Sequence, residues 1–294
     1  MVERTSSPLA VAASFEVACG SVLGRDHALA GRNAQDAYCC RLDGRGLAAV
    51  VCDGCSSGKH SEVGAKLGAA LLVEALGRHL PRLDECAPGE LLESVRRSAL
   101  RRLGTLVHAL GPERVANVNT YFLFTAVGAL IGPRRTVVFL LGDGLAYLNG
   151  RALELPPCNN RPPYLCYGLI EEALESMRRE DLRFRILADL PTAEVHTLAL
   201  GSDGASRLAG LDGGPHPAGC LSEFWTEDRF FTNPQALTRR LVQLNRGVKT
   251  IDWEARRVDH TPGPFLDDTT LVVIRRREAA SVADTGGERT CRGT

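Results

Sequence analysis

The sequence lacks several features that would point to common classes of function. Its 294 residues carry 35 basic and 35 acidic side chains, whereas a protein that works mainly by binding nucleic acid needs clustered basic residues. The longest nearly apolar run, residues 121–131, is far shorter than the roughly 20 residues of a membrane-spanning helix. A Gly-x-x-x-x-Gly-Lys-Ser/Thr phosphate loop is also missing. We therefore expect no nucleic-acid partner, no membrane segment and no nucleotide triphosphatase.

A disulfide framework and a signal peptide are not indicated either. The ten cysteines are irregularly spaced, in a chain long enough to bury a core without cross-links, and this pattern is typical of reduced thiols. The small apolar stretch at residues 9–13 is too short for a signal sequence, and it follows Glu3 rather than a basic cluster. These observations predict a cytoplasmic protein.

What the sequence does contain is an ordered series of strand and helix patterns. Short turns such as Asp43-Gly44 and Gly142-Asp143-Gly144 separate apolar runs and predict antiparallel hairpins. Strands are predicted at residues 14–23, 37–42, 46–52, 119–131, 136–141, 145–148, 196–200 and 269–274, and helices at 61–80, 89–110 and 233–244. With neither repeat nor linker, residues 1–276 are expected to form one domain, and the polar tail 277–294 to be disordered. The segment 156–195 is too weakly patterned to assign.

Four acidic residues share one feature, because each lies next to an apolar strand: Asp53, Asp143, Asp203 and Asp267. Taken singly, each fits an ordinary Asp-Gly turn or a helix cap. Taken together, carboxylates at strand ends can converge at one edge of a sheet, where they repel one another unless a cation neutralises them. Hard oxygen ligands without a histidine or cysteine set favour Mg²⁺ or Mn²⁺ over zinc.

Six short motifs follow one another along the chain: Gly31-Arg32-Asn33-Ala34-Gln35-Asp36-Ala37, Asp53-Gly54-Cys55-Ser56-Ser57, Ser61-Glu62-Val63-Gly64-Ala65, Gly142-Asp143-Gly144-Leu145-Ala146-Tyr147-Leu148, Gly201-Ser202-Asp203-Gly204 and Asp267-Asp268-Thr269-Thr270. Their order and spacing resemble the protein phosphatase 2C family of metal-dependent Ser/Thr phosphatases, especially its divergent bacterial branch. The resemblance implies an α+β fold in which two packed antiparallel sheets are flanked by helix pairs, a four-layer α-β-β-α sandwich.

The resemblance also implies a ligand set for two Mn²⁺ or Mg²⁺ ions. Asp53 would bridge the ions, the Gly54 carbonyl would bind one of them, and Asp203 and Asp267 would complete the set. Asp143 matches a third, weaker metal site, Asp268 lies next to a ligand, and Asp36 would act nearby through water. The expected reaction is attack on a phosphoserine or phosphothreonine by a metal-activated water, without a covalent intermediate. The implied partners are a phosphorylated protein and a Ser/Thr kinase or its target, in bacterial signalling.

The sequence departs from the family at two positions. Gly31 stands where many members have a phosphate-binding arginine, so Arg32 or His27 is a candidate replacement, although Arg32 equally fits an ordinary surface residue. Cys55 stands where eukaryotic members have a histidine, and His60, five residues on, is a candidate proton donor or simply a solvated side chain. Two other functions therefore stay open: a catalytically weak module that binds a phosphoprotein, and a small-molecule phosphohydrolase.

Overall fold

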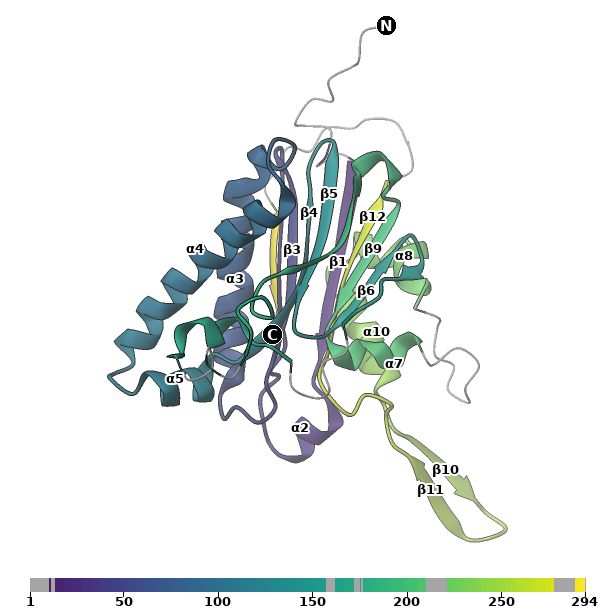
Figure 1. The fold of residues 1–294 in the computed structure, drawn as a ribbon. Coiled ribbons are helices and arrows are strands. Elements are labelled where there is room, and N and C mark those ends of the chain that lie inside the picture. Colours follow the sequence, from purple (N-terminus) through teal and green to yellow (C-terminus); the bar gives the residue numbers. More distant parts are fainter. Residues whose placement is uncertain are drawn as a thin grey trace, which may run out of the picture.

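Two antiparallel sheets form the centre of the protein (Figure 1). The computed structural model describes residues 11, 14–156, 162–171, 175, 177–209, 221–277 and 289–293. The first sheet has the strand order β1-β12-β9-β6-β7. Its strands are β1 (Phe15–Val22), β12 (Thr269–Arg276), β9 (Thr197–Gly201), β6 (Leu145–Leu148) and β7 (Arg151–Ala152).

The second sheet has the strand order β13-β2-β3-β4-β5-β8. Its strands are β13 (Arg289–Gly293), β2 (Ala37–Asp43), β3 (Gly46–Gly54), β4 (Phe124–Ile131), β5 (Arg135–Leu141) and β8 (Arg185–Pro191). The strands from β2 to β5 lie side by side and antiparallel, and the Asp43-Gly44 turn joins β2 to β3 with Asp43 opposite Gly46, as predicted. The hairpin predicted at Gly142-Asp143-Gly144 is wrong: β5 precedes this segment in the second sheet, whereas β6 follows it in the first sheet and pairs with β9. Apolar side chains from both sheets, including Phe15, Val51 and Val272, pack in a buried core between them.

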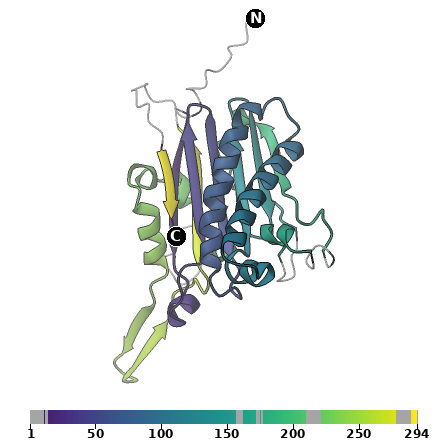
Figure 2. The same cartoon turned by 90° about the vertical axis from the view of Figure 1, so that its left-hand side faces the viewer.

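Helices α3 (Ser61–His79) and α4 (Pro88–Ala109) cover the outer face of the second sheet (Figures 1 and 2). Their apolar residues recur at helical spacing and join a second buried core with β2 to β5. Two glycines let α3 pack closely against the segment that leads into β4. A Cβ at Gly64 would lie 2.3 Å from the carbonyl oxygen of Tyr121, and one at Gly68 would lie 2.3 Å from the Phe124 ring. The first turn of α3 is thereby held beside the end of β3.

Four short helices cover the outer face of the first sheet: α7 (Ser206–Ala209), α8 (Glu223–Thr226), α9 (Arg229–Thr232) and α10 (Ala236–Leu244). Phe224, Phe230 and Leu241 pack against Ala18 and Val273 of that sheet in a third core. The layers therefore run helix, sheet, sheet, helix, which confirms the predicted α+β sandwich. Among the described residues, no helix is long and apolar enough to span a membrane.

Several elements differ from the sequence predictions. Residues 119–121 belong to helix α5 (Arg114–Tyr121) rather than to a strand, because Val118 is buried and the Asn117 amide bonds the carbonyls of Val107 and Gly111. Helix α10 begins at Ala236, since the Asn233 carboxamide oxygen accepts a hydrogen bond from the backbone N–H of Gln235 ahead of it.

The chain end also differs from the prediction of a disordered tail over 277–294. Residues 289–293 form β13, which pairs with the edge of β2 and places Arg289 opposite Leu42; residues 278–288 lie outside the described part. The single domain over residues 1–276 stays a prediction. Helix α2 (Arg25–Leu29) and the hairpin of β10 (Val248–Asp252) and β11 (Arg257–Thr261) were not predicted, and the hairpin projects from the body in both views (Figures 1 and 2).

Candidate metal centre

Three carboxylates meet where the ends of the two sheets come together. Asp53 lies near the end of β3, Asp203 follows β9, and Asp267 precedes β12. The Asp203 carboxyl hydrogen-bonds that of Asp53, and the charges of Asp36, Asp203, Asp267 and Asp143 all act on Asp53. The structure thus gathers five acidic residues from both sheets, including every aspartate that the sequence singled out as a ligand.

The crowding perturbs the acidity of these groups. Burial, reinforced by the charges of Asp36 and Asp203, raises the pKa of Asp53 well above its ordinary value. Desolvation and the nearby charge of Asp267 raise the pKa of Asp203, against the lowering effect of its hydrogen bond to Asp53. Oxygen ligands that are costly to ionise together and lie close to one another suit a hard divalent cation. The donor set therefore fits the Mg²⁺ or Mn²⁺ that the sequence implies.

Asp36 is the most deeply buried acid of the group, at 1% exposed. Burial raises its pKa to about 8, the hydroxyls of Ser202 and Thr270 lower it by hydrogen bonding, and Asp268 raises it by repulsion. Its Oδ2 has no hydrogen-bond partner within the described residues. A buried oxygen without a partner is costly, so a water or cation beside Asp36 would satisfy it.

This burial predicts a pH dependence of stability in the metal-free protein. Unfolded Asp36 releases its proton near pH 3.8, whereas the folded protein retains it to about pH 8. Between these values the folded state binds the extra proton, so the free energy of unfolding falls as pH rises, by at most about 1.4 kcal/mol per pH unit. Urea denaturation in EDTA is expected to show a shallower fall for Asp36→Asn than for the parent.

A matched control is Asp43→Asn, since hydrogen bonds from Arg45 and Arg41 outweigh burial and lower the pKa of Asp43. A lowered pKa gives a stabilising contribution that is constant at neutral pH and is lost only as the pH falls into the acid range. This variant should therefore keep the parental slope between about pH 5 and pH 8. Parallel profiles for the parent and Asp36→Asn would show that Asp36 ionises normally in the fold.

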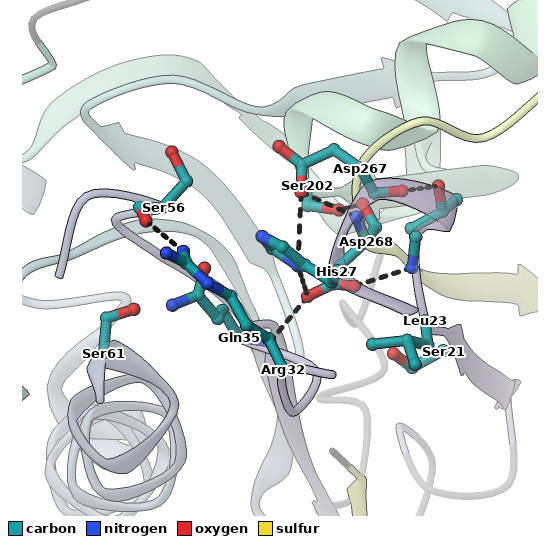
Figure 3. Close-up of polar contacts among 12 residues, drawn as sticks. Ser21, Leu23, His27, Arg32, Gln35, Ser56, Ser61, Ser202, Asp267 and Asp268 are labelled. Carbon is teal, nitrogen blue, oxygen red and sulfur yellow. Dashed lines mark hydrogen bonds and ion pairs between the residues drawn. The ribbon is translucent and has the colours of Figure 1, made fainter. Parts of the chain in front are cut away.

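Asp268 lies next to Asp267 in the sequence, but its carboxylate binds N–H groups of the chain (Figure 3). Its buried carboxylate accepts hydrogen bonds from the backbone N–H of Gly24 at 2.7 Å, the backbone N–H of Gln35 at 2.6 Å and His27 Nδ1 at 2.9 Å. His27, Asp267 and Asp268 each offer a potential ligand atom within 4.8 Å of the others. Because the Asp268 carboxylate already accepts three N–H donors, we assign it to fixing the segment between Gly24 and Gln35.

That segment is tied in turn to the loop after β3. The Gly54 N–H donates to the Gln35 carbonyl at 3.2 Å, and the Gln35 side-chain amide donates to the Gly58 carbonyl at 3.2 Å. A Cβ at Gly54 would lie 2.7 Å from the Gln35 carbonyl oxygen, so only glycine fits. These hydrogen bonds run from Asp268 through Gln35 to Gly54 and so link the three segments that carry Asp36, Gly54 and Asp267.

Arg32 and His60 occupy different surroundings. Arg32 is exposed, and its Nη1 donates to the Ser56 carbonyl at 2.7 Å, beside the loop after β3 (Figure 3). His60 stacks on Tyr121 with ring centroids 5.6 Å apart, and its Nδ1 lies 3.6 Å from Glu62 Oε1. Within the described part of the chain, neither of these His60 contacts reaches a carboxylate of the cluster.

Cys55 stands in a polar setting unlike that of Cys52. Burial raises the pKa of Cys55, but hydrogen bonds with the Ser57 hydroxyl and the Tyr164 hydroxyl outweigh it and lower the pKa overall; the Ser57 Oγ lies 3.0 Å from the sulfur. Cys52 is fully buried, and burial raises its pKa, so it is an inert thiol that fills space in the core. The pair is therefore two thiols in separate environments.

The residues from Gly54 to Gly58 also match the Gly-x-Ser-x-Gly pattern of hydrolase elbows. Such an elbow needs a strained turn that presents the serine, yet Ser56 is not among the described residues with positive φ. Its carbonyl instead receives Arg32. The local geometry thus favours a loop that supports the carboxylate cluster over a nucleophilic serine.

Sequence reasoning missed the supporting groups around the acids. Ser202 and Thr270 bond Asp36, and Gln35 links two loops, although all three lie inside the motifs that carry the resemblance. Their position directly beside the acidic residues was the available signal.

Stacked antiparallel sheets with outer helices and a carboxylate cluster at one end define a class of α+β proteins with an acidic centre suited to divalent metals. The family model of protein phosphatase 2C matches residues 23–245, and the chain belongs to this family. The serine/threonine phosphatase Stp1 of Staphylococcus aureus superposes with a TM-score of 0.50 at 15% identity, over 90% of this chain and 96% of that one.

A second similar structure is serine-threonine phosphatase 2C of Toxoplasma gondii, with a TM-score of 0.50 and 12% identity over 90% of this chain and 95% of that one. At such low identity these likenesses show the fold. The comparison with curated proteins found no match.

Proposed function

We propose that the protein hydrolyses phosphoserine and phosphothreonine in proteins with the help of Mn²⁺ or Mg²⁺. The observation that carries the proposal is the group of acids around Asp53, whose pKa is raised by burial and by four neighbouring aspartates. Stability gains little from such a cluster, because each added charge raises the cost of the others. Membership of the protein phosphatase 2C family supports the same reaction.

The ligand roles follow the positions of the acids. Asp53, which has the other acids around it, would bridge two ions, with the Gly54 carbonyl, Asp203 and Asp267 as further ligands and Asp143 at a weaker third position. Bound ions of this kind supply an activated water and neutralise phosphoryl charge. Asp36 would hold a water through its unpartnered Oδ2. Asp268 and Gln35 would keep these groups in register.

Arg32 is our candidate for gripping the substrate phosphate. Its hydrogen bond to Ser56 uses one of five guanidinium N–H groups, and the others can contact a phosphoryl oxygen. We expect Arg32→Gln to lower kcat/KM for a phosphopeptide by about tenfold, mainly through KM, because a charged hydrogen bond contributes about 1.5–3 kcal/mol. Arg101→Gln, an exposed arginine on α4, is the control, and equal KM values in both variants would remove Arg32 from this role.

The direct test measures hydrolysis of p-nitrophenyl phosphate and of a phosphothreonine peptide, with Mn²⁺, with Mg²⁺ and with EDTA. We expect turnover that needs the metal and is restored when Mn²⁺ is returned in excess. Turnover of the small substrate together with none of any phosphopeptide would instead identify a small-molecule phosphohydrolase.

Seven cysteines of the described part are free thiols, which supports a reducing, cytoplasmic setting.

A catalytically weak phosphoprotein-binding module is the second candidate. It is favoured by one observation: His60 contacts Tyr121 and Glu62, while Cys55 fills the position where the resemblance leads us to look for a proton donor. Calorimetry with Mn²⁺ and a phosphopeptide separates the two functions. Binding without turnover would support the module, and a competent turnover rate would reject it.

A further inference from the structure

The β10–β11 hairpin stands apart from the rest of the protein. Its strands form a separate two-stranded sheet that extends away from the body in both views (Figures 1 and 2), and it follows the last residue matched by the family model, 245. Every strand residue is exposed except Asp252, which is half-buried. An isolated two-stranded sheet is only marginally stable in water. The apolar side chains that this hairpin exposes add nothing to its stability unless another molecule covers them.

The register separates two chemically different faces. Lys249 lies opposite His260, and Ile251 lies opposite Val258, and because strand side chains alternate these four share one face. We call it the apolar-cationic face. Ile251 is 51% exposed and Val258 60% exposed. Trp253, 80% exposed, follows β10 directly in the turn.

Both acidic residues of the two strands lie on the opposite face. Asp259 pairs there with Arg257 at 3.2 Å, and Asp252 Oδ1 accepts the backbone N–H of Ala255 at 2.9 Å. The acids are therefore neutralised or used within the hairpin. The apolar-cationic face carries Lys249 with no strand carboxylate beside it, and its charge is complementary to an acidic partner.

The base of the hairpin is joined to the candidate metal centre. The Asn245 carboxamide, just before β10, accepts the backbone N–H of Phe265 at 3.0 Å and donates to the Leu23 carbonyl at 3.2 Å. Phe265 and Leu266 bond the first residues of α2, and Asp267 follows at once. A partner held on the hairpin is therefore connected, through the base of the hairpin, to the segment that carries Asp267.

We propose that the apolar-cationic face docks an extended acidic segment of the phosphoprotein substrate, in which acidic residues alternate with large apolar ones. Carboxylates of the segment pair with Lys249, and its apolar side chains cover Ile251, Val258 and Trp253. Such docking raises the effective concentration of the phosphorylated residue at the centre. The proposal rests on the proposed phosphatase function for the nature of the partner.

A second copy of the chain is a poorer occupant of the same face. In a two-fold dimer the same patch meets itself, so two apolar-cationic faces would bring the Lys249 ammonium groups of both copies into one interface. Like charges across an interface oppose association. An acidic segment meets no such repulsion.

The binding test uses the full chain and two unphosphorylated probes, a peptide of alternating glutamate and leucine and its counterpart with lysine for glutamate. We expect calorimetry to detect the acidic peptide only, and Ile251→Ser or Lys249→Glu to weaken it by about tenfold or more. Val248→Ser is the matched control, since Val248 lies on the opposite face and is 48% exposed. It should change the Kd by less than about twofold.

The activity test joins the acidic peptide to phosphothreonine through a Gly-Ser linker. Ile251→Ser should lower kcat/KM for this substrate by about tenfold and leave hydrolysis of p-nitrophenyl phosphate unchanged. Equal effects of Ile251→Ser and Val248→Ser, equal binding of both peptides, or a dimer that Ile251→Ser dissociates in sedimentation would overturn the docking proposal. Selective peptide binding without turnover of any phosphopeptide would support docking and refute the phosphatase function.

Discussion

Asp53→Asn is expected to abolish phosphate hydrolysis and, in the absence of metal, to stabilise the fold. Asp53 is the acid on which the charges of Asp36, Asp203, Asp267 and Asp143 all act. A neutral amide bridges cations poorly, so kcat on p-nitrophenyl phosphate with Mn²⁺ should fall on the order of 10³-fold or more. The same change removes an acidic group from a buried site where four neighbouring carboxyls repel it, so the melting temperature of the metal-free protein should rise.

The two effects are measured separately. Turnover and Mn²⁺ binding are followed by steady-state assay and calorimetry, and the melting temperature is followed in EDTA. Asp189→Asn is the control, because Asp189 is paired with Arg135 at 2.7 Å on an edge of the second sheet, away from the cluster, and should keep full activity. Retained turnover in Asp53→Asn would remove Asp53 from the metal site, and a lower melting temperature would contradict the repulsion.

The sequence was informative wherever the signal is local. Apolar periodicity located helices α3 and α4 and strands β2 to β5, because burial of one face imposes that spacing. The sequence did not show that the chain changes sheets between β5 and β6, because this depends on long-range packing. The aspartates could be grouped because each follows or precedes such a strand, and the strand order then brings their ends together. Asp53, Asp203 and Asp267 were therefore accessible to reasoning from residues alone.

The supporting contacts could not be predicted in the same way. The bond from Gly24 to Asp268 joins residues 244 positions apart, and no local pattern encodes it. His60 lies five residues from Cys55, which suggested reach toward the centre, but the start of α3 places its ring on Tyr121. The hairpin escaped notice because its strands are short and polar on one face, without a buried run.

Asp268→Ala is expected to have the opposite effect on stability from Asp53→Asn. Its carboxylate is buried and accepts three N–H donors, from Gly24, Gln35 and His27. Removing it leaves those donors without an acceptor, and we expect the free energy of unfolding to fall by about 3–5 kcal/mol. Since the same bonds hold the segment before Asp36, Mn²⁺ affinity should fall as well.

Urea denaturation in EDTA measures the first effect and calorimetry the second. Asp268→Asn is the graded control: its amide oxygen can accept some of the three bonds, but its NH₂ group faces a donor, so the loss should lie between that of the parent and that of Asp268→Ala. An Asp268→Ala protein as stable as the parent would show that the bonds are not needed. If Asp53→Asn stabilises the metal-free protein and Asp268→Ala destabilises it, the two carboxylates have different roles. Asp53 then serves to bind a cation and costs the metal-free fold stability, whereas Asp268 fixes the chain around the metal site.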